Sequence, residues 1–267
     1  MNVNNYTNER LIKYSLVLSS LVLLNYFFWS INSWQIIRYI NFFLLLLTFT
    51  HFFVSTKFNS YWHVKIIILL LLLICLGSPT SAIDSRSLFL FSAKILFYES
   101  NLYFRLDSNN DIINHFTDVV YSKPKLAITL SATLSQLLGY WNEIYPKSTN
   151  IIIILPPIIF LISFFKERAF ALLWVFIVLF FSGRLLINGL MDGIIALYFV
   201  ASVLISYKIF TQKKESEKLL FYLLLFVFFS ILSLTKNEGG VMVVMIFLSS
   251  LFIDLIYKKR VNLKLLF

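Results

Sequence analysis

A long polar segment, residues 83–123, interrupts a chain that is otherwise strongly apolar. It begins with Asp84-Ser85-Arg86, directly after an apolar run of membrane-spanning length, and Lys94 and Lys123 follow within it. A carboxylate at a membrane surface can accept a hydroxyl proton or bind a divalent cation, and cations beside it can hold a phosphate. The alternatives are that Asp84 only caps a helix beginning near Ser87, and that the cations extend to lipid headgroups.

Two further polar motifs adjoin apolar runs. Asp192 lies in Asn188-Gly189-Leu190-Met191-Asp192-Gly193, which we interpret as part of an apolar helix. A carboxylate at the centre of such a helix costs roughly 2.5–3.5 kcal/mol, so Asp192 should have a partner, for which Lys236 and Arg184 are candidates. Lys236 and Glu238 lie in the short turn Thr235-Lys236-Asn237-Glu238-Gly239 and are candidate substrate-binding residues. Alternatively, Asp192 belongs to an ion pair that only fixes helix packing, and Gly239-Gly240 only ends a helix.

The composition indicates an integral membrane protein. Of the 267 residues, 59% are hydrophobic and 13% are charged, whereas soluble domains carry about 25% charged residues. The net charge of +10 is best explained by Lys and Arg beside membrane spans, so no nucleic-acid partner is expected. A single cysteine excludes a disulfide framework within the chain, and the scattered histidines predict no metal site.

The predicted fold is an all-α, polytopic transmembrane bundle of about eight or nine spans with one long extracytoplasmic loop carrying short interfacial helices. Three regions are expected: two N-terminal helices in 1–64, a catalytic module in 65–257 with the outer loop 83–123, and a basic end in 258–267. The expected spans are 11–31, 39–54, 65–82, 150–165, 169–182, 186–207, 219–235 and 241–257.

The stretch from Pro124 to Gly139 is too polar for lipid exposure, and we expect it to lie at the interface or to line a cavity. If it does not cross the membrane, every basic loop and both termini can be cytoplasmic. That arrangement brings the candidate residues to the outer face, together with Trp141-Asn142-Glu143. Ionisable groups at membrane depth usually pair around a cavity, so we expect a single polar site there.

Five motifs in order resemble the GT-C superfamily of membrane glycosyltransferases, near its protein O-mannosyltransferase and aminoarabinose-transferase branch. The motifs are Asp84-Ser85-Arg86 with Ala93-Lys94, Lys123-Pro124, Gly139-Tyr140-Trp141-Asn142-Glu143, Gly189-Leu190-Met191-Asp192-Gly193, and Leu234-Thr235-Lys236-Asn237-Glu238-Gly239. Here the outer loop lacks the acidic residue expected at its end, and two extra spans precede the matching region. Further helices would be expected after Phe267, which suggests a C-terminally truncated member.

The resemblance implies a hexosyltransferase that uses a polyprenyl-phosphate sugar and acts on a glycan, lipid or protein acceptor. It implies that Asp84 is the catalytic base and Asp192 a supporting carboxylate, and that Lys123 and Lys236 contact phosphate. A divalent cation is a conceivable cofactor. The expected location is a bacterial inner membrane, with the site on the extracytoplasmic side. The alternatives are a non-catalytic scaffold, a carrier-lipid or glycan transporter, and an O-antigen polymerase or ligase.

Overall fold

The computed structural model describes residues 3–31, 34–55, 61–77, 89–102, 125–142, 144–165, 191–212 and 214–258. These residues form helices and no β-strand, which confirms the all-α prediction. The helices are α1 (Val3–Ser30), α2 (Gln35–Val54), α3 (Trp62–Gly77), α4 (Phe91–Glu99), α6 (Leu126–Leu138), α7 (Tyr145–Phe164), α9 (Asp192–Thr211), α10 (Glu215–Thr235) and α11 (Asn237–Lys258).

Five segments of the described helices are long and apolar enough to cross a membrane: Glu9–Ser30, Gln35–Val54, Tyr145–Phe164, Asp192–Thr211 and Glu217–Thr235. Shorter apolar helices cover Trp62–Gly77, Leu126–Leu138 and Asn237–Ile253. The expected span at 169–182 lies outside the described residues, so the count of eight stays a prediction. The long helices are compatible with an integral membrane protein.

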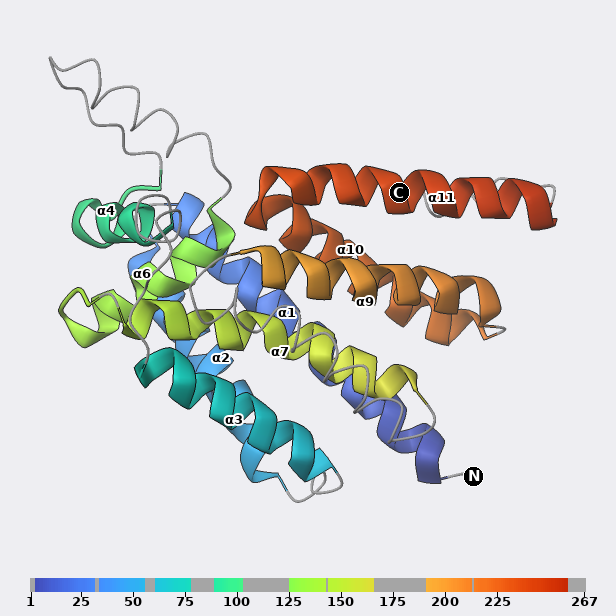
Figure 1. The fold of residues 1–267 in the computed structure, drawn as a ribbon, viewed down its shortest axis with the longest axis horizontal. Helices are drawn as coiled ribbons and strands as arrows, with labels where there is room; N and C mark the ends of the chain where they lie inside the picture. The colour runs from blue at the N-terminus through green and yellow to red at the C-terminus, as the bar shows by residue number, and fades with distance from the viewer. Residues whose placement is uncertain are drawn as a thin grey trace, which may run out of the picture.

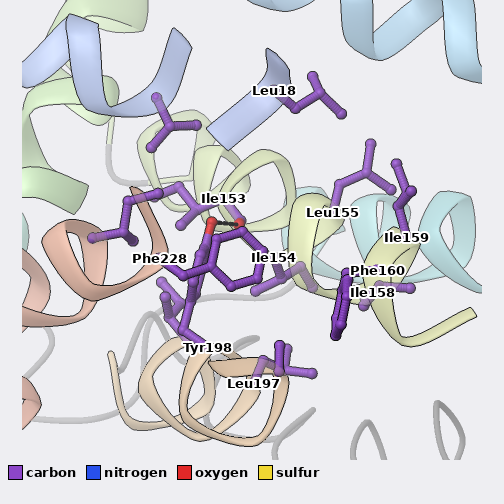
Figure 2. Close-up of a cluster of buried hydrophobic side chains, with 14 of the residues drawn as sticks. Leu18, Ile153, Ile154, Leu155, Ile158, Ile159, Phe160, Leu197, Tyr198 and Phe228 are labelled. Carbon is purple, nitrogen blue, oxygen red and sulfur yellow. Dashed lines mark hydrogen bonds between the residues drawn. The ribbon is translucent and has the colours of Figure 1, made fainter. Parts of the chain in front are cut away.

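Helix α7 forms the centre of the bundle, and every residue from Pro146 to Ser163 is buried. It packs most extensively against α1 and also contacts α3, α6 and α9. Figure 2 shows the apolar cluster around it, in which Ile153, Ile154 and Phe160 lie near side chains of α1, α9 and α10. The N-terminal helix α1 is therefore a core element of the same bundle as α7.

Pro156 and Pro157 lie inside α7, and the helix continues through both. Pro157 has no N–H group, so the carbonyl of Ile153, four residues earlier, loses its usual helical donor. The buried hydroxyl of Tyr198 on α9 donates to this carbonyl oxygen at 2.8 Å, as Figure 2 shows. A side chain of the neighbouring helix thus supplies the hydrogen bond that the proline removes, and it ties α9 to α7.

Helix α6 lies in the stretch Pro124–Gly139, for which the sequence left two locations open, the membrane interface and the lining of a cavity. At 13 residues and about 1.5 Å per residue it is shorter than the ~30 Å hydrocarbon layer. Its polar side chains are buried within the protein: Trp29 Nε1 donates to Thr133 Oγ1 at 2.8 Å, and Ser131 Oγ donates to the carbonyl of Pro146 at 2.8 Å. Hydrogen bonds to α1 and α7 therefore offset the polarity of this helix.

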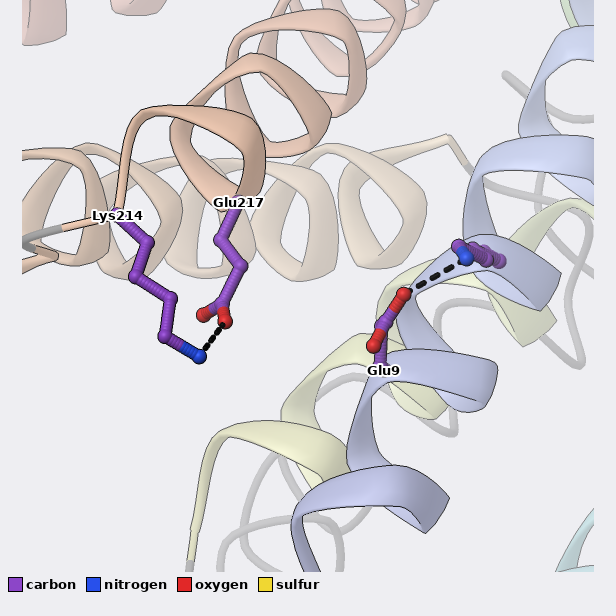
Figure 3. A network of polar contacts seen from close by, with 4 residues as sticks. Glu9, Lys214 and Glu217 are labelled. Atoms are coloured by element: carbon purple, nitrogen blue, oxygen red, sulfur yellow. Dashed lines mark hydrogen bonds and ion pairs between the residues drawn. The ribbon is translucent and has the colours of Figure 1, made fainter.

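The helices run between two ends of the molecule, which Figure 1 shows at its left and right. We call the side from which α7, α9 and α11 start the polar end; in Figure 1, α7 begins at the far left, whereas α9 begins and α10 turns into α11 left of the centre. At the other end, the basic end, α1 begins and α9 gives way to α10. Figure 3 shows ion pairs of the basic end, between Lys214 and Glu217 at 3.0 Å and between Glu9 and Lys13 at 2.7 Å.

This arrangement predicts that cysteines at Tyr140 and Lys214 are labelled from opposite sides of the membrane. Both side chains are exposed, and they lie at the polar and basic ends respectively. The native Cys75 is buried and should be replaced by Ala to remove its background. We expect an impermeant maleimide to reach position 140 from the extracytoplasmic side and position 214 only after the membrane is opened. Labelling of both from one side would contradict the arrangement.

Candidate functional site

Asp192 lies at the first position of α9, at the polar end of the bundle. Asp192 belongs to an apolar helix, as the sequence predicted, but it lies at the first position of that helix and its side chain is 46% exposed. A carboxylate in the first turn of a helix is stabilised by the partial positive charge of the unpaired N–H groups there. The start of α9 therefore helps to stabilise the charge of Asp192.

Lys236 connects α10 to α11, and its side chain contacts both Asp192 and Glu238. Its Nζ lies 2.7 Å from Asp192 Oδ1 and 3.5 Å from a carboxylate oxygen of Glu238. The pairing of Asp192 with Lys236 that the sequence predicted is confirmed; Arg184, the other candidate, lies outside the described residues. We call Asp192, Lys236 and Glu238 the carboxylate–lysine cluster.

The charges in this cluster keep the ammonium of Lys236 protonated. Burial lowers the pKa of Lys236, but the hydrogen bond to Asp192 and the two carboxylates outweigh it and raise the pKa above 10.5. The stabilisation from this shift is fully present below pH 10.5 and is lost only as the pH rises through the folded-state pKa. The cluster combines one ammonium group with the side chains of two acidic residues.

A net negative cluster can polarise a hydroxyl group, accept its proton or attract a cation. The described parts of the chain contain no group of three or more His, Cys, Asp and Glu side chains that could hold a metal ion. Asp192 and Glu238 alone offer fewer ligands than Ca²⁺ or Mg²⁺ usually takes. A divalent cation at this cluster would therefore need waters or substrate oxygens as its remaining ligands.

The turn that holds Lys236 depends on a close approach between two helices. Gly239 lies in the first turn of α11, so it does not end a helix as the sequence analysis allowed. Its N–H donates to the carbonyl of Lys236 at 2.9 Å. A Cβ at position 239 would overlap the Leu232 carbonyl group, whose carbon would be 2.6 Å away. The glycine thus lets α11 start directly against the end of α10.

Lys94 lies on α4, also towards the polar end, and its side chain is exposed. This short helix packs on α6, where the amide of Gln136 donates to Ser100 Oγ at 3.0 Å and to the carbonyl of Phe97 at 3.3 Å. Gln136 Oε1 accepts from Arg38 at 2.6 Å. Gln136 therefore holds α4 against α2 and α6, while Lys94 remains accessible.

The other predicted site residues, Asp84, Arg86 and Lys123, lie outside the described residues, as does Glu143. The structure does describe residues on both sides of 78–88 and of 103–124. Helix α3 ends at Gly77, and Lys125 Nζ donates to the carbonyl of Leu102 at 2.6 Å, which ties together the residues that flank 103–124. Burial lowers the pKa of Lys125.

Lys147 and Asn150 are polar residues of the polar end that the sequence analysis missed. Both lie in the first two turns of α7, and each is only 1% exposed. The sequence places them in Tyr145-Pro146-Lys147-Ser148-Thr149-Asn150, ahead of the span expected at 150–165. Pro146 signals a helix start, and a helix beginning there would have put both side chains on neighbouring positions of one face.

We expect Gly239→Ala to destabilise the protein, because the added methyl group must displace either α11 or the Leu232 carbonyl. Overpacking of this kind costs about 1–3 kcal/mol. Gly240→Ala is the matched control, since a Cβ there meets nothing within 4 Å and the change favours a helix by roughly 0.5–1 kcal/mol. Thermal unfolding in detergent measures both. Equal stability of the two variants would contradict the close approach.

Comparison with known proteins finds no matching family model, no similar curated protein and no similar solved structure. The resemblance to the GT-C glycosyltransferases therefore rests on the sequence motifs.

Proposed function

We propose that this protein is a membrane glycosyltransferase that moves a sugar from a polyprenyl-phosphate carrier to an acceptor hydroxyl group. In the reaction, the acceptor oxygen attacks the anomeric carbon, and the bond between that carbon and the phosphate oxygen breaks. The acceptor proton passes to a carboxylate, and the polyprenyl phosphate leaves with the bonding electron pair. The protein must therefore supply a base and stabilise the negative charge that grows on the phosphate.

The observation that carries this proposal is the contact between two of the predicted site motifs, at the start of α9 and at the α10–α11 junction. The start of α9 and the α10–α11 junction bring Asp192 to Lys236 across 44 residues of sequence. Helix α4, which carries Lys94, is docked at the same end through Gln136. Asp84 itself lies outside the described residues, in the sequence between the end of α3 and the start of α4. The motifs that contain Asp192 and Lys236 are far apart in sequence, so their contact supports a shared site for these two motifs.

The roles follow from the resemblance and from the charges of the cluster. Asp84 is the proposed base. Asp192 holds the ammonium of Lys236 in place, and that ammonium has donors left for a phosphate oxygen, because a lysine carries three. Glu238, at 3.5 Å from the ammonium, is free to turn towards an acceptor hydroxyl. An anionic phosphate would add negative charge to a cluster that is already negative. Lys94 or further cations must therefore help to neutralise the phosphate.

The side of the membrane follows from the charge distribution. Lysines lie at the basic end around the start of α1, the start of α3 and the α9–α10 junction, whereas those of the polar end include the buried Lys147 and the ion-paired Lys236. Positive residues in loops favour the cytoplasmic side, which supports placing the basic end there. The polar end then faces the extracytoplasmic side, where lipid-linked sugars are used. We place the protein in a bacterial inner membrane, with its donor and its glycan, lipid or protein acceptor meeting at the outer surface.

If the carboxylate–lysine cluster is functional, Asp192→Asn and Lys236→Met should each lower turnover by about tenfold or more, the size of one lost charge-assisted hydrogen bond. The unfolding free energy should change by less than about 1 kcal/mol, since the pair is partly exposed. Lys214→Met is the matched control, because it breaks an ion pair at the basic end. Turnover and thermal unfolding are measured on the same samples. A stability loss with unchanged turnover would mean that the pair only fixes helix packing.

If Asp84 is the base, Asp84→Asn should reduce turnover at least about a hundredfold, because general-base catalysis contributes about 10²–10⁴ in rate. Asparagine keeps the shape and the capping ability but cannot take the proton, so donor binding should persist. Glu99→Gln, which removes an exposed carboxylate on α4, serves as the control and should retain full turnover. Radiolabelled donor lipid reports both binding and transfer. Full activity of Asp84→Asn would leave Asp84 a helix cap.

A further inference from the structure

The buried amide of Asn150 stands out among the polar groups at the polar end. Asn150 is 1% exposed, and neither its Nδ2 nor its Oδ1 has a hydrogen-bond partner in the structure as described. The other buried asparagine of comparable depth, Asn25 on α1, is paired on both sides, with Thr129 at 3.3 Å and Thr133 at 3.4 Å. A buried amide without partners is costly, so Asn150 requires an explanation that Asn25 does not.

A cation accompanies this amide on the same helix. Lys147 lies one turn before Asn150, and it is also 1% exposed. It is close enough to Cys75, near the end of α3, for the two side chains to interact electrostatically. On α7, residues three apart are neighbours, so the ammonium and the amide lie on adjoining parts of one helix surface. Both groups lie in the first turns of α7, where the helix dipole favours a negative charge.

The polar groups beside this pair are already in use. Thr149 Oγ1 donates to the carbonyl of Pro146 at 2.7 Å and lies 3.0 Å from Ser131 Oγ. Ser131 in turn donates to the same carbonyl from α6. These bonds fasten α6 to the start of α7 and leave the Asn150 amide out of the network. The amide donor and acceptor of Asn150 therefore remain unused among the described residues.

We propose that Asn150 and Lys147 bind the phosphate of the polyprenyl-phosphate carrier, an inference that rests on the proposed function. The Nδ2 group donates to a phosphate oxygen, and the ammonium of Lys147 offsets the phosphate charge. The Oδ1 atom accepts from a hydroxyl group of the attached sugar. The positive end of α7 adds to the attraction. This site supplies cationic charge that the carboxylate–lysine cluster, with its net negative charge, lacks.

Asn150→Leu separates binding from a structural role, because leucine has a similar volume and needs no partner. We expect the melting temperature of the ligand-free protein to stay the same or rise, since an unpaired buried amide is removed. Asn25→Leu, the matched control, should instead lower the melting temperature by about 2–4 °C or more, because it breaks two hydrogen bonds. A fall in melting temperature for Asn150→Leu comparable to that of Asn25→Leu would overturn the proposal.

Binding is measured with the purified full chain in nanodiscs, using polyprenyl phosphate, neutral polyprenol and inorganic phosphate as probes. We expect polyprenyl phosphate to raise the melting temperature of the wild type and polyprenol not to. Competition by inorganic phosphate at millimolar concentration would identify the phosphate alone as the group recognised; no competition would mean that the lipid chain is also needed. Asn150→Leu should weaken polyprenyl-phosphate binding by about 10–100-fold, the loss of one hydrogen bond to a charged group.

The binding experiment tests this site separately from the glycosyltransferase function. Binding that depends on Asn150 in a protein that transfers no sugar would preserve this site and reject the glycosyltransferase function. Transfer by a protein whose polyprenyl-phosphate affinity is equal in wild type and Asn150→Leu would reject this site and preserve the function. Equal binding of polyprenol and polyprenyl phosphate would also overturn the proposal.

Discussion

The hydrogen bond from Tyr198 to the carbonyl of Ile153 is the contact on which the bundle depends. Helix α7 is buried along nearly its whole length and contains two adjacent prolines. In a lipid bilayer a freed backbone carbonyl must find a donor within the protein. Tyr198 supplies it at 2.8 Å, so α9 is fixed against α7 at a defined point along both helices. Helices α1, α3 and α6 also pack on α7, so α7 is in contact with most of the bundle.

This constraint reaches the polar end through α9. Asp192 is the first residue of that helix, six positions before Tyr198, and it therefore lies about two turns from the fixed point. Helix α10 packs on both α9 and α1, and the close approach at Gly239 places Lys236 where α10 turns into α11. The carboxylate–lysine cluster is thus positioned by buried backbone contacts on both sides, while its own side chains remain partly exposed.

The sequence predicted the features that follow from the cost of burying charge and backbone in lipid. The helical fold, the basic end and the pairing of Asp192 with Lys236 all follow from that cost. Prediction from the sequence failed for polar segments that are surrounded by other helices of the protein instead of by lipid or water. For the stretch Pro124–Gly139 the sequence left two locations open, the interface and the lining of a cavity, whereas the hydroxyl groups of α6 form hydrogen bonds to α1 and α7. The burial of Lys147 and Asn150 could not be predicted, because the residues that cover them come from distant parts of the chain.

The glycosyltransferase function is tested most directly with purified protein in nanodiscs and a panel of radiolabelled polyprenyl-phosphate sugars. Extracytoplasmic glycans, lipids and peptides from bacterial envelopes serve as acceptors. We predict that one donor loses its sugar to an acceptor, with one polyprenyl phosphate released for each sugar transferred, and that Asp192→Asn slows this reaction without unfolding the protein. If folded wild-type protein transfers no sugar from any donor in the panel, the proposed function is contradicted.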